Sequence, residues 1–169
     1  MEKHNGVWGG CWCVAFHPKS DEPKQTAASN RAYKERLVRA NQAHAALVYD
    51  ESDVVGWSQF GRPVELPARM GGFRKLGLAA PDWRITCFFV DRDRRREGIA
   101  EVALAGALHI VAANGGGTVD GYPIATRGKP YASSFLFGGT ESMFVEAGFR
   151  PVGALGTSKV VMRRRVRGR

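Results

Sequence analysis

The chain has 169 residues, of which 44% are hydrophobic and 24% are charged. This composition excludes wholesale disorder, a collagen and a simple coiled coil. The 25 Lys and Arg residues against 16 Asp and Glu residues give a formal net charge of +9, so an anionic partner is expected rather than a cationic one. Net charge alone does not separate a nucleic acid from a phosphorylated small molecule.

The sequence predicts neither a membrane segment nor a disulfide. It has no run of about 18 or more apolar residues, and its first residues lack the layout of a signal peptide. A cytoplasmic location without a membrane partner is therefore expected. Cys11 and Cys13 would point to opposite faces of the strand predicted there. A metal site of Cys11, Cys13 and His17 is disfavoured, because zinc sites usually use a second, more widely spaced ligand pair.

The first half of the chain alternates apolar runs with turn-forming residues. Ser29 or Asn30 can cap a helix, and four turn-forming residues at 50–53 predict an antiparallel hairpin. The expected elements are a strand over 7–16, a helix from 29 or 30 to about 43, strands over 45–49 and 54–60, and a short helix within an irregular stretch over 63–81.

The second half predicts one central strand and a long helix. The run 83–90 is apolar on both faces toward its end, as a central strand is. Glycines at 115–117 terminate the helix that starts at Gly98. The expected elements are strands over 83–90, 118–122, 149–153 and 159–166, helices over 98–113 and 140–147, and an ambiguous piece at 132–137. Such an order implies a mixed sheet with helices packed on its faces.

The arginine-rich end, residues 163–169, has two interpretations. It could be an arm that binds nucleic acid. It also has the character of an edge strand that charge protects from aggregation, followed by a frayed terminus. The second interpretation is favoured, so nucleic acid is not the expected partner.

The segment 94–100, Arg-Arg-Arg-Glu-Gly-Ile-Ala, joins the central strand to the long helix. A helix start exposes unpaired backbone N–H groups at the positive end of the helix dipole, where anions bind. Gly98 and the small Ala100 would let a pyrophosphate approach the backbone. The segment therefore predicts a phosphate site, with a solvated basic turn as the alternative. The common nucleotide-hydrolase and dinucleotide motifs are absent from the sequence.

Two motifs resemble those of the GNAT superfamily of acyl-CoA-dependent acyltransferases. The core motif Arg/Gln-x-x-Gly-x-Gly/Ala is matched by Arg95, Gly98 and Ala100, and the run 143–149 resembles the closing helix that ends in Gly-Phe. The resemblance covers residues 54–166. It implies one α+β domain over residues 1–169, with a mixed, mostly antiparallel central sheet, helices on both faces and a variable substrate-side part at 1–43.

The resemblance also implies an activity. This is transfer of an acetyl group from acetyl-CoA, or of another acyl group from its CoA ester, to an amine of a small molecule or peptide by direct attack. No metal is implied, and a homodimer is left open. The backbone N–H of Val90 would stabilise the oxyanion. The residues implied to hold the cofactor are Phe88, Phe89, Val90, Arg95, Arg96, Gly98, Ile99, Ala100 and Phe144.

The sequence departs from the family pattern where protons are transferred. Phe144 stands where a tyrosine often protonates the leaving thiolate, and Phe137 stands where an asparagine is common. The acidic residue expected on the central strand is missing, since residues 85–87 are Ile, Thr and Cys. These departures keep a second hypothesis open, namely a catalytically silent acyl-CoA-binding or nucleic-acid-associated domain.

Asp120 is the best remaining candidate for the general base, because it is predicted on the strand after the long helix. The alternative is a structural carboxylate that pairs with an arginine. The candidates considered weaker are Glu65, Asp82, His17 and His44.

Overall fold

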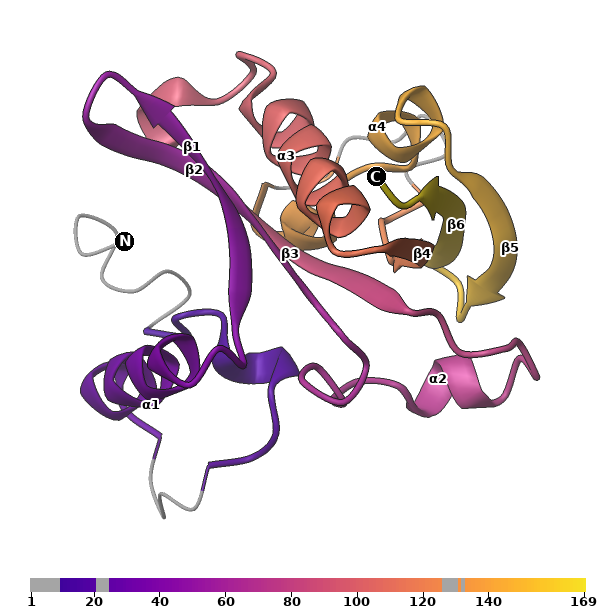
Figure 1. Cartoon of the computed structure of the whole chain (residues 1–169), viewed down its shortest axis with the longest axis horizontal. Helices are drawn as coiled ribbons and strands as arrows, with labels where there is room; N and C mark the ends of the chain where they lie inside the picture. The colour runs from indigo at the N-terminus through magenta and orange to yellow at the C-terminus, as the bar shows by residue number, and fades with distance from the viewer. Residues whose placement is uncertain (1–9, 21–24, 126–130, 132) are drawn as a thin grey trace.

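The computed structural model describes residues 10–20, 25–125, 131 and 133–169. Its centre is a six-stranded sheet with the order β1-β2-β3-β4-β6-β5 (Figure 1). The strands are β1 (His44–Asp50), β2 (Asp53–Gly61), β3 (Trp83–Val90), β4 (Gly116–Gly121), β5 (Arg150–Leu155) and β6 (Lys159–Arg167). All neighbouring strands pair antiparallel except β3 and β4, which are parallel. The predicted mixed, mostly antiparallel sheet is confirmed.

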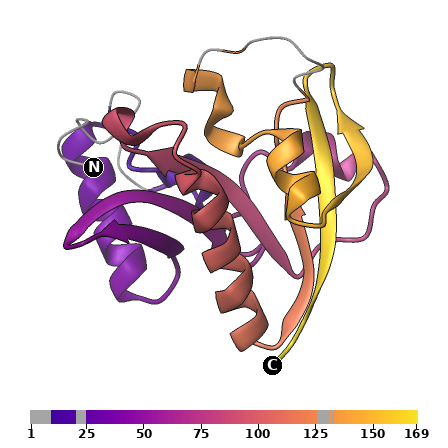
Figure 2. The ribbon, with the colours of Figure 1, turned by 90° about the horizontal axis from the view of Figure 1, so that it is seen from above.

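Helices pack on both faces of this sheet, as predicted. They are α1 (Ala27–Arg39), α2 (Gly71–Arg74), α3 (Ile99–Ala113) and α4 (Glu141–Glu146), with 3-10 helices η2 (Val14–Phe16), η3 (Arg92–Arg94) and η4 (Ser133–Gly138). Leu104 and Val111 of α3 and Phe144 of α4 share the main core with one sheet face. Phe16 of η2 packs with Cys87 on the opposite face. Figure 2 shows α3 lying between the N-terminal hairpin and the C-terminal strands.

Local capping explains why α1 begins before the predicted position. The hydroxyl of Thr26 accepts a hydrogen bond from the N–H of Ser29 at 3.1 Å, and the Ser29 hydroxyl accepts one from the N–H of Thr26 at 2.9 Å. This reciprocal capping box satisfies two N–H groups of the first turn. The helix ends at Arg39 rather than near Ala43, since Asn41 adopts a φ of 56°. No helix in the described part of the chain is long and apolar enough to cross a membrane.

The strand predicted over 7–16 is wrong where the structure describes it. Residues 10–13 form a turn that leads into η2, and residues 7–9 lie outside the described part. Trp12 and Cys13 have φ values of 46° and 51°, which an extended strand does not allow. The Asn30 side chain donates a hydrogen bond to the Gly10 carbonyl at 2.8 Å, which ties this turn to α1. Cys11 and Cys13 are therefore not on opposite faces of a strand.

The arginine-rich end is an interior strand and not an edge, which corrects the prediction. β6 lies between β4 and β5. Arg167 pairs with Gly116, and the N–H of Arg169 donates to the carbonyl of Ala112 at 3.0 Å. Two of its guanidinium groups have acceptors: Arg163 binds Asp120, and Arg164 binds the carbonyl of Ala147.

Candidate active site

The sheet opens between its two parallel strands. β3 and β4 pair at three positions, from Trp83 with Val119 to Ile85 with Gly121. Beyond Gly121 the chain turns away, and Ile124 forms bridges with Thr140 and Lys159 instead. Within the described residues, the β3 backbone from 86 to 90 therefore has no partner on β4.

Two backbone N–H groups of β3 point toward this opening. The N–H of Asp91 bonds to the carbonyl of Val55 on β2 at 2.8 Å. Because N–H groups along a strand alternate in direction, those of Val90 and Phe88 face the other way, toward β4. Val90 is the residue that the resemblance implies for oxyanion stabilisation, and its N–H faces the opening.

The predicted phosphate loop follows directly at the end of β3. Gly98 is the N-cap residue of α3 with a φ of 75°, and no side chain caps the helix there. A Cβ atom at Gly98 would meet no atom within 4 Å, so the space above the backbone is open. The N–H groups of the first turn of α3, which begins at Ile99, have no partner within the helix. Arg95 and Arg96 are exposed beside this helix start.

Arg94 has a structural role, unlike the exposed Arg95 and Arg96. Its guanidinium binds Glu97 at 2.8 Å and the carboxylate of Asp50 on the β1–β2 hairpin. These contacts hold the loop against the hairpin. The Ile99 side chain is also structural, because it is buried against Gly56. Only the backbone of Ile99 faces the helix start.

Phe144 is fully buried, at 0% exposure. Its ring lies edge-on to Phe149 and Phe88, with centroids 4.9 and 6.1 Å away. A Cβ atom at Gly121 would lie 2.1 Å from the Phe144 ring, so the ring fills the space over β4. Phe144 therefore contacts Phe88, which lies at the opening. Its side chain has no acidic group that could protonate a leaving thiolate.

Asp120 is also fully buried, and both of its carboxylate oxygens bind Arg163, at 2.7 and 2.8 Å. Burial raises the pKa of Asp120, while the Arg163 guanidinium opposes this effect. Arg163 donates a further hydrogen bond to the carbonyl of Ala79 at 2.8 Å. These contacts favour the structural alternative over the general base.

A buried polar cluster lies on the α1 side of β3, and sequence reasoning did not find it as a unit. The Lys34 ammonium donates to Gln59 Oε1 at 2.5 Å and contacts His17 Nε2 at 3.0 Å. His17 Nδ1 lies 3.0 Å from the carbonyl of Glu65, and Gln59 Nε2 donates to Thr86 Oγ1 at 3.0 Å. Of these residues, the sequence points only to His17 and Glu65, each as a weaker candidate for the base. The spacing of these residues in the sequence does not predict the contacts, because the residues come from separate elements.

This cluster predicts a pH-dependent stability. Burial, followed by the Lys34 charge, lowers the pKa of His17 from 6.5 to about 4. Between these values the unfolded chain binds a proton that the folded chain does not, so stability falls as pH falls through this window. The loss approaches about 3 kcal/mol at pH 4.

Denaturant unfolding at several pH values measures this loss. Wild type should lose about 3 kcal/mol more than His17→Gln between pH 6.5 and 4, whereas the His109→Gln variant, changed at an exposed position, should behave as wild type. Equal losses in wild type and His17→Gln would contradict the prediction.

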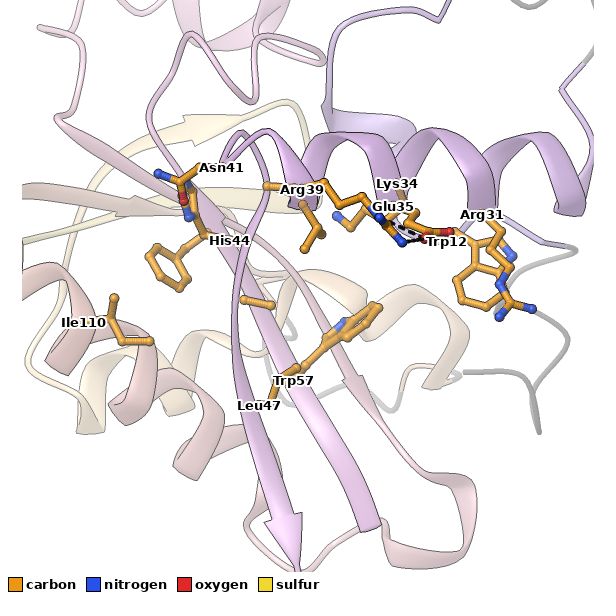
Figure 3. Close-up of a pocket in the computed structure, with 14 residues that line it drawn as sticks. Trp12, Arg31, Lys34, Glu35, Arg39, Asn41, His44, Leu47, Trp57 and Ile110 are labelled. Atoms are coloured by element: carbon orange, nitrogen blue, oxygen red, sulfur yellow. Dashed lines mark hydrogen bonds and ion pairs between the residues drawn. The ribbon is translucent and has the colours of Figure 1, made fainter. Parts of the chain in front are cut away.

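A pocket of about 730 Å³ lies between α1 and the β1–β2 hairpin (Figure 3). Trp12, Leu47 and Trp57 contribute apolar surface to it, and Arg31 and Lys34 contribute cations. The Trp57 ring also contacts Phe89 on β3, with centroids 6.1 Å apart. Trp57 therefore connects the pocket wall to the strand that borders the opening. No group of three or more His, Cys, Asp or Glu residues in the described ranges is placed to hold a metal ion.

Solved structures show which fold this is, although no family model and no curated protein matches the chain. An N-acetyltransferase from Staphylococcus aureus superposes with a TM-score of 0.56 at 15% identity, covering 99% of this chain and 95% of the other. A ribosomal-protein-alanine N-acetyltransferase from Brucella melitensis gives 0.53 at 14% identity, with 98% and 96% covered. An acetyltransferase assigned to the GNAT family from Desulfovibrio desulfuricans gives 0.52 at 20% identity, with 82% and 79% covered.

The chain therefore has the fold of the GNAT acetyltransferases. Within this fold, the structure places the candidate cofactor residues Phe88 and Val90 at the opening, and Gly98 at the following helix start. It places Asp120 in a buried ion pair and the Phe144 ring in the core.

Proposed function

We propose that this protein is an acyl-CoA-dependent acyltransferase that moves an acetyl group from acetyl-CoA to an amine of a small molecule or peptide. The observation that carries the proposal is the direct succession of two features. β3 borders the opening in the sheet, and the uncapped start of α3 at Gly98 follows it. An extended pantetheine arm can pair with the part of β3 that β4 does not cover, and the pyrophosphate can bind the helix N–H groups.

The chemistry needs few side chains. The amine nitrogen attacks the thioester carbonyl carbon and the C–N bond forms. The C–S bond then breaks to release the CoA thiolate, and the nitrogen gives its proton to water. In this proposal the N–H group of Val90 stabilises the oxyanion, an effect worth roughly 3 to 4 kcal/mol for one donor. Because a thiol has a pKa near 8.5, CoA can leave as the thiolate without an acid at Phe144.

The acceptor amine is proposed to bind in the pocket between α1 and the hairpin. Trp57 connects this pocket to β3. The cationic residues Arg31, Lys34 and Arg39 line the pocket, whereas its lining has one anionic residue, Glu35. Such surroundings disfavour an ammonium and therefore favour the neutral, nucleophilic amine. The same cations and the tryptophans suit an acceptor that carries an apolar group and a carboxylate.

The test measures acetyl-CoA binding by calorimetry and release of the CoA thiol over a panel of amines with and without a carboxylate. Binding should raise the stability of the protein by about 2.7 kcal/mol at a hundred times the dissociation constant. Release should be fastest with apolar amines that carry a carboxylate. Binding without release over the panel would support the silent acyl-CoA-binding domain, and failure to bind acetyl-CoA would overturn the proposal.

A further inference from the structure

Two cysteines that are 74 residues apart in sequence meet inside the protein. The Sγ atoms of Cys13 and Cys87 lie 3.3 Å apart, and the two residues are 4% and 8% exposed. Cys13 precedes η2, whereas Cys87 belongs to β3. Since a disulfide bond is about 2.05 Å long, the two sulfur atoms need to approach by only about 1.2 Å to bond.

The two thiols are chemically unequal. A hydrogen bond from Cys87 lowers the pKa of Cys13, against the opposing effect of burial, and the charge of Lys34 lowers it further. The same contact with Cys13, together with burial, raises the pKa of Cys87. The left-handed backbone of Trp12 and Cys13, with φ values of 46° and 51°, is a strained conformation that non-glycine residues seldom adopt. Such an asymmetric pair provides one thiolate that attacks and one thiol that resolves.

We propose that Cys13 and Cys87 form a redox-active pair that a small hydroperoxide converts to a disulfide and that a thiol reductant restores. The Cys13 thiolate attacks one peroxide oxygen, the O–O bond breaks, and a sulfenic acid forms. The departing hydroxide takes up the proton that the Cys13 thiol lost on ionisation and leaves as water. The Cys87 thiol then attacks the sulfenic sulfur, the S–S bond forms, and a second water leaves. Two thiols and one hydrogen peroxide thus give one disulfide and two waters, with both electrons of the oxidation ending in the peroxide.

The disulfide would connect the turn before η2 to β3 in the immediate neighbourhood of Phe88. It would also lie beside the acceptor pocket, because Trp57 packs against the cluster that contains both cysteines. The chemistry of the pair does not rest on acyl transfer, so this proposal can succeed or fail independently of the proposed function.

Peptide mapping of the full-length protein tests the proposal. After treatment with hydrogen peroxide, free thiols are alkylated in denaturant and the protein is digested with trypsin. The expected product joins peptide 4–19 to peptide 85–92, lacks two hydrogen atoms, and disappears on reduction with dithiothreitol. Peptide 4–19 contains both Cys11 and Cys13, so the Cys11→Ser variant should give the same cross-link, whereas Cys13→Ser should not.

Two further measurements use folded protein. A cross-link over 74 residues restricts the unfolded chain, so oxidation should raise the melting temperature by about 10 °C. Lys34→Gln should slow oxidation at neutral pH several-fold, because the thiolate loses its cationic neighbour. A link between Cys11 and Cys13, or a Cys87 that remains fully alkylated after peroxide treatment of wild type, would overturn the proposal.

Discussion

Replacement of Gly98 with Glu is expected to weaken acetyl-CoA binding at least about a hundredfold. Gly98 has a φ of 75° and open space above its backbone, so a side chain there would occupy the volume proposed for the pyrophosphate. The carboxylate would also place a negative charge at the helix start where an anion is proposed to bind. Isothermal titration calorimetry with acetyl-CoA measures the change.

Gly77 provides the matched control. It has a φ of 64°, and its Cβ position also meets nothing within 4 Å. Gly77→Glu therefore introduces the same charge and a similar backbone strain of about 1 kcal/mol or more, but away from α3. Both variants should show similar losses in melting temperature, and only Gly98→Glu should lose affinity. If Gly98→Glu bound acetyl-CoA with the same affinity as wild type, the proposed phosphate site at this loop would be wrong.

The second large effect is expected in stability. Asp120→Asn should lower the free energy of unfolding by about 3 kcal/mol, because it leaves the Arg163 guanidinium without its anionic partner. The Asp120 side chain is 0% exposed and that of Arg163 is 20% exposed. Water therefore cannot replace the lost ion pair by solvating the guanidinium fully. The exposed ion pair of Glu35 and Arg39, at 55% and 78% exposure, is the control, and Glu35→Gln should cost under about 0.5 kcal/mol.

The pH profile of Asp120→Asn separates the two roles of this carboxylate. If Asp120 is structural, the rate per folded molecule stays near wild type at every pH. A general base would instead make the rate fall by about a hundredfold at neutral pH and recover at high pH, where the amine is already neutral. The bidentate contact with Arg163 leads us to expect the first outcome. The second would reinstate Asp120 as the base.

Local sequence determined the elements of the sheet and the loop between β3 and α3. The apolar run at 83–90 matches β3, and the turn-forming residues after β1 produce the expected hairpin. Gly98 adopts the left-handed conformation at the helix start. These features are predictable because strand burial, turns and helix ends depend mainly on residues close together in the chain.

Tertiary structure alone decided the remaining features. Residues 10–13 form a turn that a hydrogen bond between Asn30 and Gly10 ties to α1. The arginine-rich end is an interior strand because β4 and β5 pair on either side of it. The contact of Cys13 with Cys87 joins residues from distant elements. Chain periodicity carries no information about such contacts, since they form only when separate elements pack and their polar groups must find partners out of water.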